Sequence, residues 1–143
     1  YMTPKSMGVE EEKVGVIAGA FPLLHPGYIN LLEECKDNCS RLIVFLHTDP
    51  SLSRATKAKP LFSINERTRM LLSLRGVAEV FPYDGESDLY NLLKTMAPDI
   101  RFLGTDYKDK AYTGEGLDIP IHWVDRSHGW STTKMINLIK QMP

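Results

Sequence analysis

Short apolar runs alternate with helical patterns along most of the chain, and this alternation is the feature that most restricts the fold. The runs are Val14–Ala20, Arg41–His47, Val77–Phe81, Ile100–Leu103 and Ile119–Val124. Their length and their β-branched residues indicate buried strands. Strands that alternate with helices form a parallel sheet with helices on both faces. The sequence therefore predicts an α/β fold, a Rossmann-like open sheet of five parallel strands.

Helices are expected between and after these strands. The predicted helices are His25–Lys36, Ser63–Arg75, Ser87–Met96 and Ser131–Ile139. Ser63 and Glu66 have the spacing of a capping box, and Ser87 and Ser131 stand at N-cap positions. Ligands of such open sheets bind beyond the carboxyl ends of the strands, where the strand order reverses. The loops after the strands are therefore the segments in which chemistry is expected.

Composition narrows the class of protein and its partners. The 143 residues fit one domain, and 17 Lys and Arg against 18 Asp and Glu give a formal charge of −1. This balance gives no electrostatic case for nucleic acid or a membrane surface as the main partner. Residues 1–12 lack the apolar centre of a signal peptide and are predicted to be a flexible tail or an expression remnant. Cys35 and Cys39 have no zinc-ligand spacing, so reduced thiols and a cytoplasmic location are expected.

The loop after the first strand carries an anion-binding pattern. A turn at Gly19 leads into a helix N-terminus, where backbone N–H groups favour negative charge. His25 stands at that terminus, where it could donate to a phosphate oxygen and stabilise the charge that grows there. A single loop histidine can equally have an ordinary structural role, and the spacing alone does not decide between the two.

Two further loops carry cations and hydroxyl groups. Arg54, Lys57 and Lys59 follow the second strand, either as a solvated basic loop or as an arm that closes a lysine onto a polyphosphate. After the last strand, Arg126 precedes a glycine turn, and the hydroxyl groups of residues 131–133 begin a helix. A guanidinium fork, hydroxyl groups and the N–H groups of a helix start all favour phosphate.

These loops resemble two signatures of the nucleotidylyltransferase superfamily. Residues 19–28 are similar to its Gly-x-Phe-Asp-x-x-His-x-Gly-His signature, and residues 126–133 to the Arg-Thr-Glu-Gly-Ile-Ser-Thr-Thr motif of its cytidylyltransferase branch. Residues 104–107 resemble the Gly-Asp segment that follows the fourth strand. The resemblance spans residues 14–139 and is greatest to glycerol-3-phosphate cytidylyltransferases. It implies that residues 13–143 form a nucleotidylyltransferase domain.

The resemblance also implies roles for individual residues. The implied catalytic residues are His25, Lys57, Lys59 and Arg126, with either Lys57 or Lys59 as the phosphate-binding lysine. The implied nucleotide-binding residues are Gly19, Ala20, Phe21, Tyr28, Asp106, Arg126, Gly129, Ser131 and Thr132. The implied acceptor-binding residues are Arg67 and Arg75, for which a helix-surface position is the alternative. Asp106 would face either the nucleotide or the acceptor.

Four positions depart from the family signatures. Pro22 replaces the Asp of the first signature, and Tyr28 replaces its second His. Tyrosine can donate a hydrogen bond to a phosphate but carries no positive charge, so the stabilisation expected from it is lower. In the last motif, Ser127 and His128 stand where the family has Thr-Glu.

The implied activity is the transfer of CMP from CTP to a phosphorylated alcohol such as glycerol 3-phosphate, with release of pyrophosphate. Mg²⁺ would be held mainly by substrate phosphates rather than by a metal site of the protein, and the relatives imply a homodimer. One alternative is an adenylyltransferase that uses ATP and a sugar phosphate, because residues 105–108 resemble the Gly-Asp-Tyr-Lys of heptose-type adenylyltransferases. Another is a nucleotide-binding homologue whose catalysis is weakened by Pro22 and Tyr28. A flavodoxin-like or receiver-like domain is disfavoured, because residues 19–28 contain no acidic residue.

Overall fold

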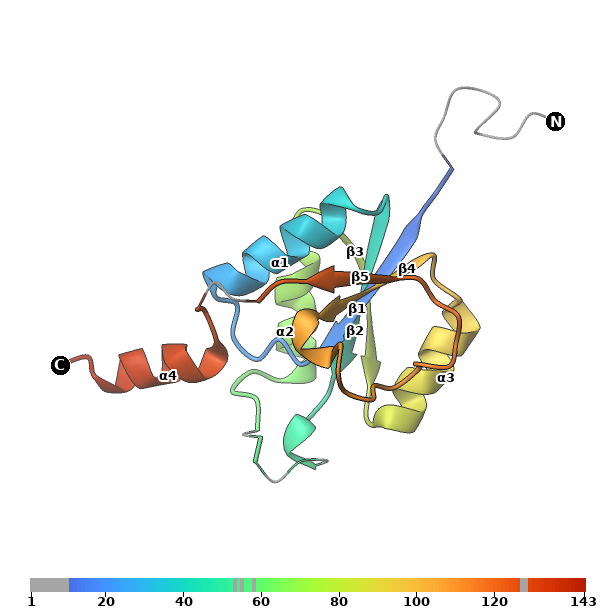
Figure 1. The fold of residues 1–143 in the computed structure, drawn as a ribbon. Coiled ribbons are helices and arrows are strands. Elements are labelled where there is room, and N and C mark those ends of the chain that lie inside the picture. Colours follow the sequence, from blue (N-terminus) through green and yellow to red (C-terminus); the bar gives the residue numbers. More distant parts are fainter. Residues whose placement is uncertain (1–10, 53, 55, 58, 127–128) are drawn as a thin grey trace.

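A computed structural model describes residues 11–52, 54, 56–57, 59–126 and 129–143. Its centre is a five-stranded sheet in the order β3-β2-β1-β4-β5, with every neighbouring pair parallel (Figure 1). The strands are β1 (Val14–Gly19), β2 (Arg41–His47), β3 (Val77–Tyr83), β4 (Ile100–Gly104) and β5 (Ile121–Val124). The predicted Rossmann-like α/β fold is confirmed. Residues 1–10 of the expected tail, Ser127 and His128 lie outside the described residues.

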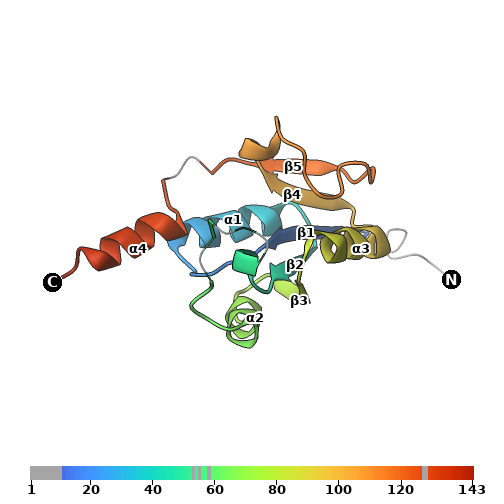
Figure 2. The same ribbon diagram turned by 90° about the horizontal axis from the view of Figure 1, so that it is seen from below.

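Helices cover both faces of the sheet (Figure 2). They are α1 (Pro26–Asp37), α2 (Ile64–Leu72), α3 (Glu86–Met96) and α4 (Thr132–Lys140), with short 3₁₀ turns η1 (Pro50–Leu52) and η2 (Thr105–Tyr107). Leu32 of α1 and Leu71 of α2 join one core cluster, and Leu89 and Leu93 of α3 join the other. α4 extends away from the sheet and has no buried residue within its described length. None of the described helices is long and apolar enough to cross a membrane.

Most of the helix N-caps that the sequence predicted are confirmed. Ser63 and Glu66 form the predicted capping box, and Ser131 caps α4 as expected. The N-cap of α3 is Gly85 rather than Ser87, so that prediction is wrong because the helix starts earlier than its first serine. β3 runs past Pro82, which an edge strand tolerates because its outer N–H groups have no partner strand.

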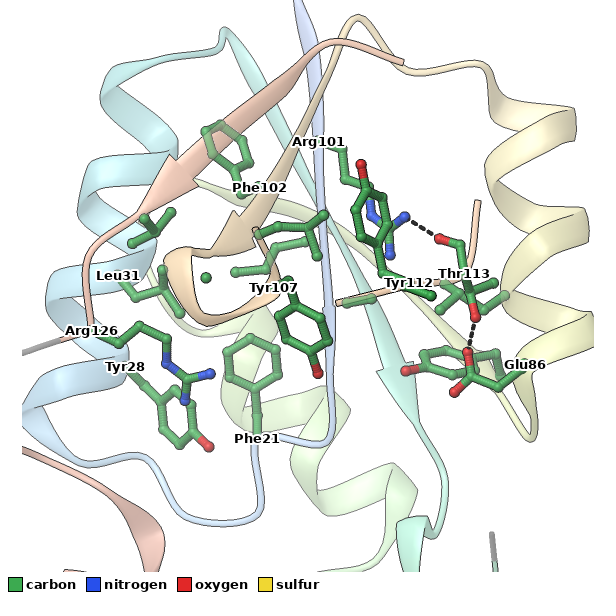
Figure 3. Close-up of a pocket in the computed structure, with 18 of the residues that line it drawn as sticks. Phe21, Tyr28, Leu31, Glu86, Arg101, Phe102, Tyr107, Tyr112, Thr113 and Arg126 are labelled. Carbon is green, nitrogen blue, oxygen red and sulfur yellow. Dashed lines mark hydrogen bonds between the residues drawn. The ribbon is translucent and has the colours of Figure 1, made fainter. Parts of the chain in front are cut away.

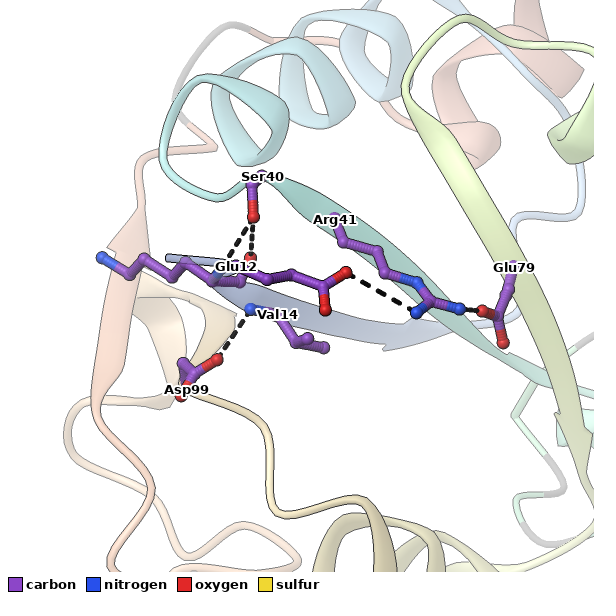
Figure 4. A network of polar contacts seen from close by, with 7 residues as sticks. Glu12, Val14, Ser40, Arg41, Glu79 and Asp99 are labelled. Atoms are coloured by element: carbon purple, nitrogen blue, oxygen red, sulfur yellow. Dashed lines mark hydrogen bonds and ion pairs between the residues drawn. The ribbon is translucent and has the colours of Figure 1, made fainter. Parts of the chain in front are cut away.

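The amino-terminal edge of the sheet is held by polar contacts between neighbouring segments (Figure 4). The N–H of Val14 donates to the Asp99 carboxylate at 2.8 Å, which joins β1 to the residue before β4. Arg41, at the start of β2, forms ion pairs with Glu12, at 3.6 Å, and with Glu79. Exposed pairs of this kind contribute about 0–1 kcal/mol each. This edge is therefore structural, and it lies at the opposite end of the strands from the loops that were predicted to carry chemistry.

Arg67 joins the loops at the carboxyl-terminal edge. Its side chain is 2% exposed, and its Nε donates to the Phe62 carbonyl at 3.0 Å. Its Nη1 donates to the carbonyls of Ala20 and His47 at 2.8 and 2.7 Å, and its Nη2 to that of Thr48 at 2.5 Å. Burial lowers the pKa of Arg67, but a guanidinium remains charged in a protein. The structure thus gives Arg67 a structural role, because backbone carbonyls occupy four of its five N–H donors, and its contact with an acceptor stays a prediction.

Replacing this buried arginine tests its structural role. We expect Arg67→Met to lower the free energy of unfolding by about 3 kcal/mol, because several carbonyls would lose their hydrogen-bond donor. Urea denaturation measures the change. Arg69→Met is the matched control on the exposed side of the same helix, and its effect should stay within about 0.5 kcal/mol. Equal losses for the two variants would contradict the structural role of Arg67.

Candidate active site

A cavity of about 460 Å³ opens at the carboxyl ends of β1, β4 and β5. This volume is in the range of small-molecule sites. Figure 3 shows Tyr28 and Arg126 at one end of the cavity, Arg101 and Tyr112 at the other, and Tyr107 between them. The cavity lies where the strand order reverses between β1 and β4, the place at which the sequence predicted a ligand.

The loop after β1 holds Phe21 in a left-handed backbone conformation. Its φ of 44° is rare for a bulky residue and costs about 1–3 kcal/mol. The ring of Phe21 is 4% exposed, lines the cavity and lies 5.0 Å from the Tyr28 ring, measured between centroids. Burial of the ring offsets the backbone strain. Such strain concentrates at functional sites, and Phe21 and Tyr28 are both residues predicted for the nucleotide pocket.

His25 begins α1 and is buried. It is the N-cap of the helix, and its Nδ1 accepts a hydrogen bond from the Gly27 N–H at 3.1 Å. Because Nδ1 is the acceptor, the neutral ring carries its proton on Nε2, which makes Nε2 a donor. The imidazole stacks on the Tyr28 ring with centroids 4.2 Å apart. His25 does not line the cavity. Its ring stacks on that of Tyr28, and Tyr28 does line the cavity.

The same stack reaches the loop before α4. The rings of His25 and Trp130 are nearly parallel, with centroids 6.4 Å apart, so this loop lies against the start of α1. Gly129 has a φ of 84°, a conformation that favours glycine, and Ser131 caps the helix that follows. The Oγ1 of Thr132 is buried and makes no hydrogen bond to any residue that the structure describes. A phosphate oxygen at this helix start would satisfy that hydroxyl group.

Arg126 and Asp106 meet at the end of β4. Arg126 lines the cavity from the segment after β5. A Cβ atom on Gly104 would lie 3.0 Å from the Cδ of Arg126 and would also overlap the Asp106 carboxylate. Glycine at this position therefore allows both side chains to approach the strand end. The structure thus brings together two residues that were predicted for nucleotide binding from separate motifs.

The basic loop after β2 reaches the cavity through a residue other than the predicted lysines. Lys57 and Lys59 are exposed, and neither lines the cavity. Arg54, the third cation of the same loop, is part of the cavity wall. Phosphate binding by either lysine stays a prediction.

Several other predicted residues also lie away from the cavity wall. Gly19 ends β1, and the carbonyl of Ala20 is occupied by Arg67. Arg75 is exposed beyond the end of α2. Their contacts with substrates stay predictions. Within the described residues, no three His, Cys, Asp or Glu side chains are grouped as a metal site would require.

The half of the cavity around Arg101 was missed by sequence reasoning. Arg101 lies inside β4, is 4% exposed, and donates through Nη1 to the Thr113 carbonyl. Its guanidinium carbon is 5.6 Å from the centroid of the Tyr112 ring. The Thr113 hydroxyl group in turn donates to the Glu86 carboxylate at the start of α3. A cation is costly to bury without a partner, so an arginine inside a predicted apolar strand is a signal of function. That signal could have identified Arg101 from the sequence.

The fold and the site define a nucleotidyltransferase-like domain. The parallel sheet, the cavity at its switch point and the paired helix starts agree with that class. The chain belongs to the cytidylyltransferase-like family, whose profile matches residues 16–136.

Known proteins similar to this chain support the family assignment. The bifunctional protein HldE of Caulobacter vibrioides is 36% identical over 129 residues, which cover 87% of this chain and 26% of that protein. The chain thus spans about a quarter of the length of this curated relative. The lipopolysaccharide core biosynthesis protein of Thermoplasma volcanium is 26% identical with a TM-score of 0.64, and the match covers 80% of this chain and 96% of that one. Nicotinic acid mononucleotide adenylyltransferase of Plasmodium falciparum, at 15% identity and a TM-score of 0.56, shares the fold over 89% of this chain and 71% of its own.

Removal of the Arg126 charge tests the predicted contact of this residue with a nucleotide. We expect Arg126→Met to weaken ATP binding about tenfold, because a charge-assisted hydrogen bond to phosphate would be lost. Isothermal titration calorimetry measures the affinity. Arg75→Met serves as the control, since Arg75 is exposed and outside the cavity wall, and it should bind ATP like the unmodified protein. An unchanged affinity of Arg126→Met would argue against a phosphate contact of this residue.

Proposed function

We propose that this domain transfers an adenylyl group from ATP to the phosphate of a sugar phosphate and releases pyrophosphate. The observation that carries the proposal is the stack of Tyr28, His25 and Trp130, which joins the starts of α1 and α4 beside the cavity. Two neighbouring helix starts, each with N–H groups that favour negative charge, suit a polyphosphate. ATP is preferred to CTP for two reasons. The curated relative named above is an HldE protein, which suggests an adenylyltransferase that uses ATP. In addition, residues 105–108 resemble the Gly-Asp-Tyr-Lys of heptose-type adenylyltransferases.

The proposed reaction is a direct in-line displacement. An oxygen of the acceptor phosphate attacks the α-phosphorus of ATP and forms a new P–O bond. The bond between the α-phosphorus and the bridging oxygen to the β-phosphate breaks, and its electron pair leaves with pyrophosphate. No covalent intermediate with the protein is needed, so catalysis rests on positioning and on stabilising the negative charge that develops.

His25 would be the main donor to the phosphates. Its Nδ1 is held by the Gly27 N–H, so its Nε2–H would donate to an oxygen at the reacting phosphorus. Arg126 and the Thr132 hydroxyl group would hold the remaining phosphate oxygens. Tyr28, stacked on His25, would donate one hydrogen bond without adding positive charge. We therefore expect a slower reaction than a second histidine would support.

Mg²⁺ is the proposed cofactor. It prefers phosphate oxygens, waters and one or two carboxylates, and Asp106, beside Arg126 at Gly104, would supply a carboxylate. When bound, the ion neutralises part of the triphosphate charge.

Cytidylyl transfer to glycerol 3-phosphate is the second candidate. The family description and the likeness of residues 126–133 to the cytidylyltransferase motif favour it. The two candidates differ in nucleotide and in acceptor, so one assay separates them.

Pyrophosphate release is the test of the proposed reaction. With Mg²⁺, we expect release with ATP and a sugar phosphate and not with CTP and glycerol 3-phosphate. His25→Asn should slow the reaction about 10²- to 10³-fold, because asparagine caps the helix well but lacks the Nε2 donor. His122→Asn is the matched control, since His122 bonds to Glu34 outside the cavity wall. Release only with CTP would establish the second candidate, and full activity of His25→Asn would remove the histidine from the mechanism.

We also propose that the domain forms a homodimer through α4. The helix exposes Leu138 and Ile139, with exposed fractions of 44% and 56%, and Met142, just beyond the end of the helix, is 69% exposed. Apolar side chains grouped in this way are typical of a surface that binds another protein.

Sedimentation tests the dimer. A dimer of the 16.2 kDa chain is expected at micromolar concentration, and Ile139→Glu should convert it to the monomer because a charge would be buried at the contact. Leu52→Glu, an equal change at an exposed leucine on another element, should leave the mass unchanged. A monomeric unmodified chain would contradict the proposal.

A further inference from the structure

Arg101 is a buried cation that the proposed reaction does not use. It pairs in the sheet with Val16, so its side chain lies on the α3 face, the face opposite to its neighbour Phe102. A parallel strand covered on both faces is normally apolar throughout. Among the described residues, no carboxylate lies within ion-pair distance of Arg101. Buried charges are normally paired, so a ligand is a natural source of the missing counter-ion.

The contacts of Arg101 with the neighbouring loop do not compensate for the burial of its charge. The bond to the Thr113 carbonyl uses one of the five N–H donors of the guanidinium. The Tyr112 ring packs near the guanidinium carbon and supplies a weak cation–π attraction. Burial lowers the pKa of Arg101, and nearby Tyr112, Tyr83 and Glu86 oppose that change. The group nevertheless stays charged at neutral pH.

The surroundings of Arg101 suit a polar ligand of sugar size. Tyr83, Tyr107 and Tyr112 line this half of the cavity, and each offers a ring and a hydroxyl group. Glu86 lines it too, and its carboxylate already accepts from Thr113. Carboxylate and phenol groups can bind the hydroxyl groups of a polyol.

We propose that the acceptor carries a second anionic group, a carboxylate or a further phosphate, and that Arg101 binds it. This inference rests on the proposed function. The reacting phosphate must reach the α-phosphorus near the starts of α1 and α4, whereas Arg101 lies at the other end of the cavity (Figure 3). An acceptor that reaches from the α-phosphorus of ATP to Arg101 therefore carries one anion at each of its ends. The substrate class is a sugar phosphate with a second negative group remote from the reactive phosphate.

Calorimetry with matched probes tests this subsite without turnover. The probes are glucose 1-phosphate, glucuronic acid 1-phosphate and glucose 1,6-bisphosphate, which differ in the group at the far end of the sugar. We expect one or both of the probes with a second anionic group to bind roughly 10- to 100-fold more tightly than glucose 1-phosphate. The tighter of the two identifies the second group as a carboxylate or a phosphate. Equal affinity of the three probes, or binding of none, would overturn the proposal.

Variants then assign the preference to Arg101. Arg101→Met keeps most of the side-chain volume and should remove the difference between probes. Arg41→Met, the same change at the opposite edge of the sheet, should retain it. A preference that survives in Arg101→Met would contradict the assignment. If Arg101→Met does not fold, Arg101→Lys decides, because lysine keeps the charge but loses the guanidinium fork and should bind the probe with a second anionic group less tightly.

The outcome separates this inference from the proposed function. An Arg101-dependent preference without consumption of ATP would support the subsite and reject adenylyl transfer. Turnover of ATP with glucose 1-phosphate and no preference among the probes would support adenylyl transfer and reject the subsite.

Discussion

The reversal of strand order between β1 and β4 is the constraint on which the site depends. The chain turns to one side of the sheet order after β1 and to the other after β4, so the loops that follow these strands diverge, and a cavity of about 460 Å³ lies there. Arg67 holds the loops after β1 and β2 by their carbonyls, which fixes one wall of that opening. The burial of Phe21 then stabilises a backbone conformation that costs free energy on its own. Stability and site geometry thus rely on the same few residues.

Aromatic stacking brings together parts of the site that are far apart in the sequence. His25 lies in the first loop and Trp130 in the last, and their nearly parallel rings place the starts of α1 and α4 next to each other. Each helix start favours negative charge through its N–H groups. Arg126 adds a cation at the same end of the cavity. This end of the cavity therefore combines several modest contributions to anion binding without a cluster of charged residues.

The sequence predicts the fold well because its signals are local. Strand runs, helix periods and the capping box at Ser63 each depend on nearby residues, and these are confirmed. The roles of Arg67 and Ala20 could not be predicted in this way, because both depend on the distance between loops. Arg101 was visible as a charge inside a strand, but its cavity is formed by segments distant in sequence. Patterns along the chain identify residue types that suit a reaction, whereas packing decides which of them reach the cavity.

A crystal structure of the chain with a non-hydrolysable ATP analogue and Mg²⁺ tests the central claim most directly. We expect the triphosphate between the starts of α1 and α4, with His25 Nε2 and the Thr132 hydroxyl group within hydrogen-bond distance of its oxygens. A triphosphate bound elsewhere, for example on the exposed lysines of the basic loop with no contact to either helix start, would contradict it.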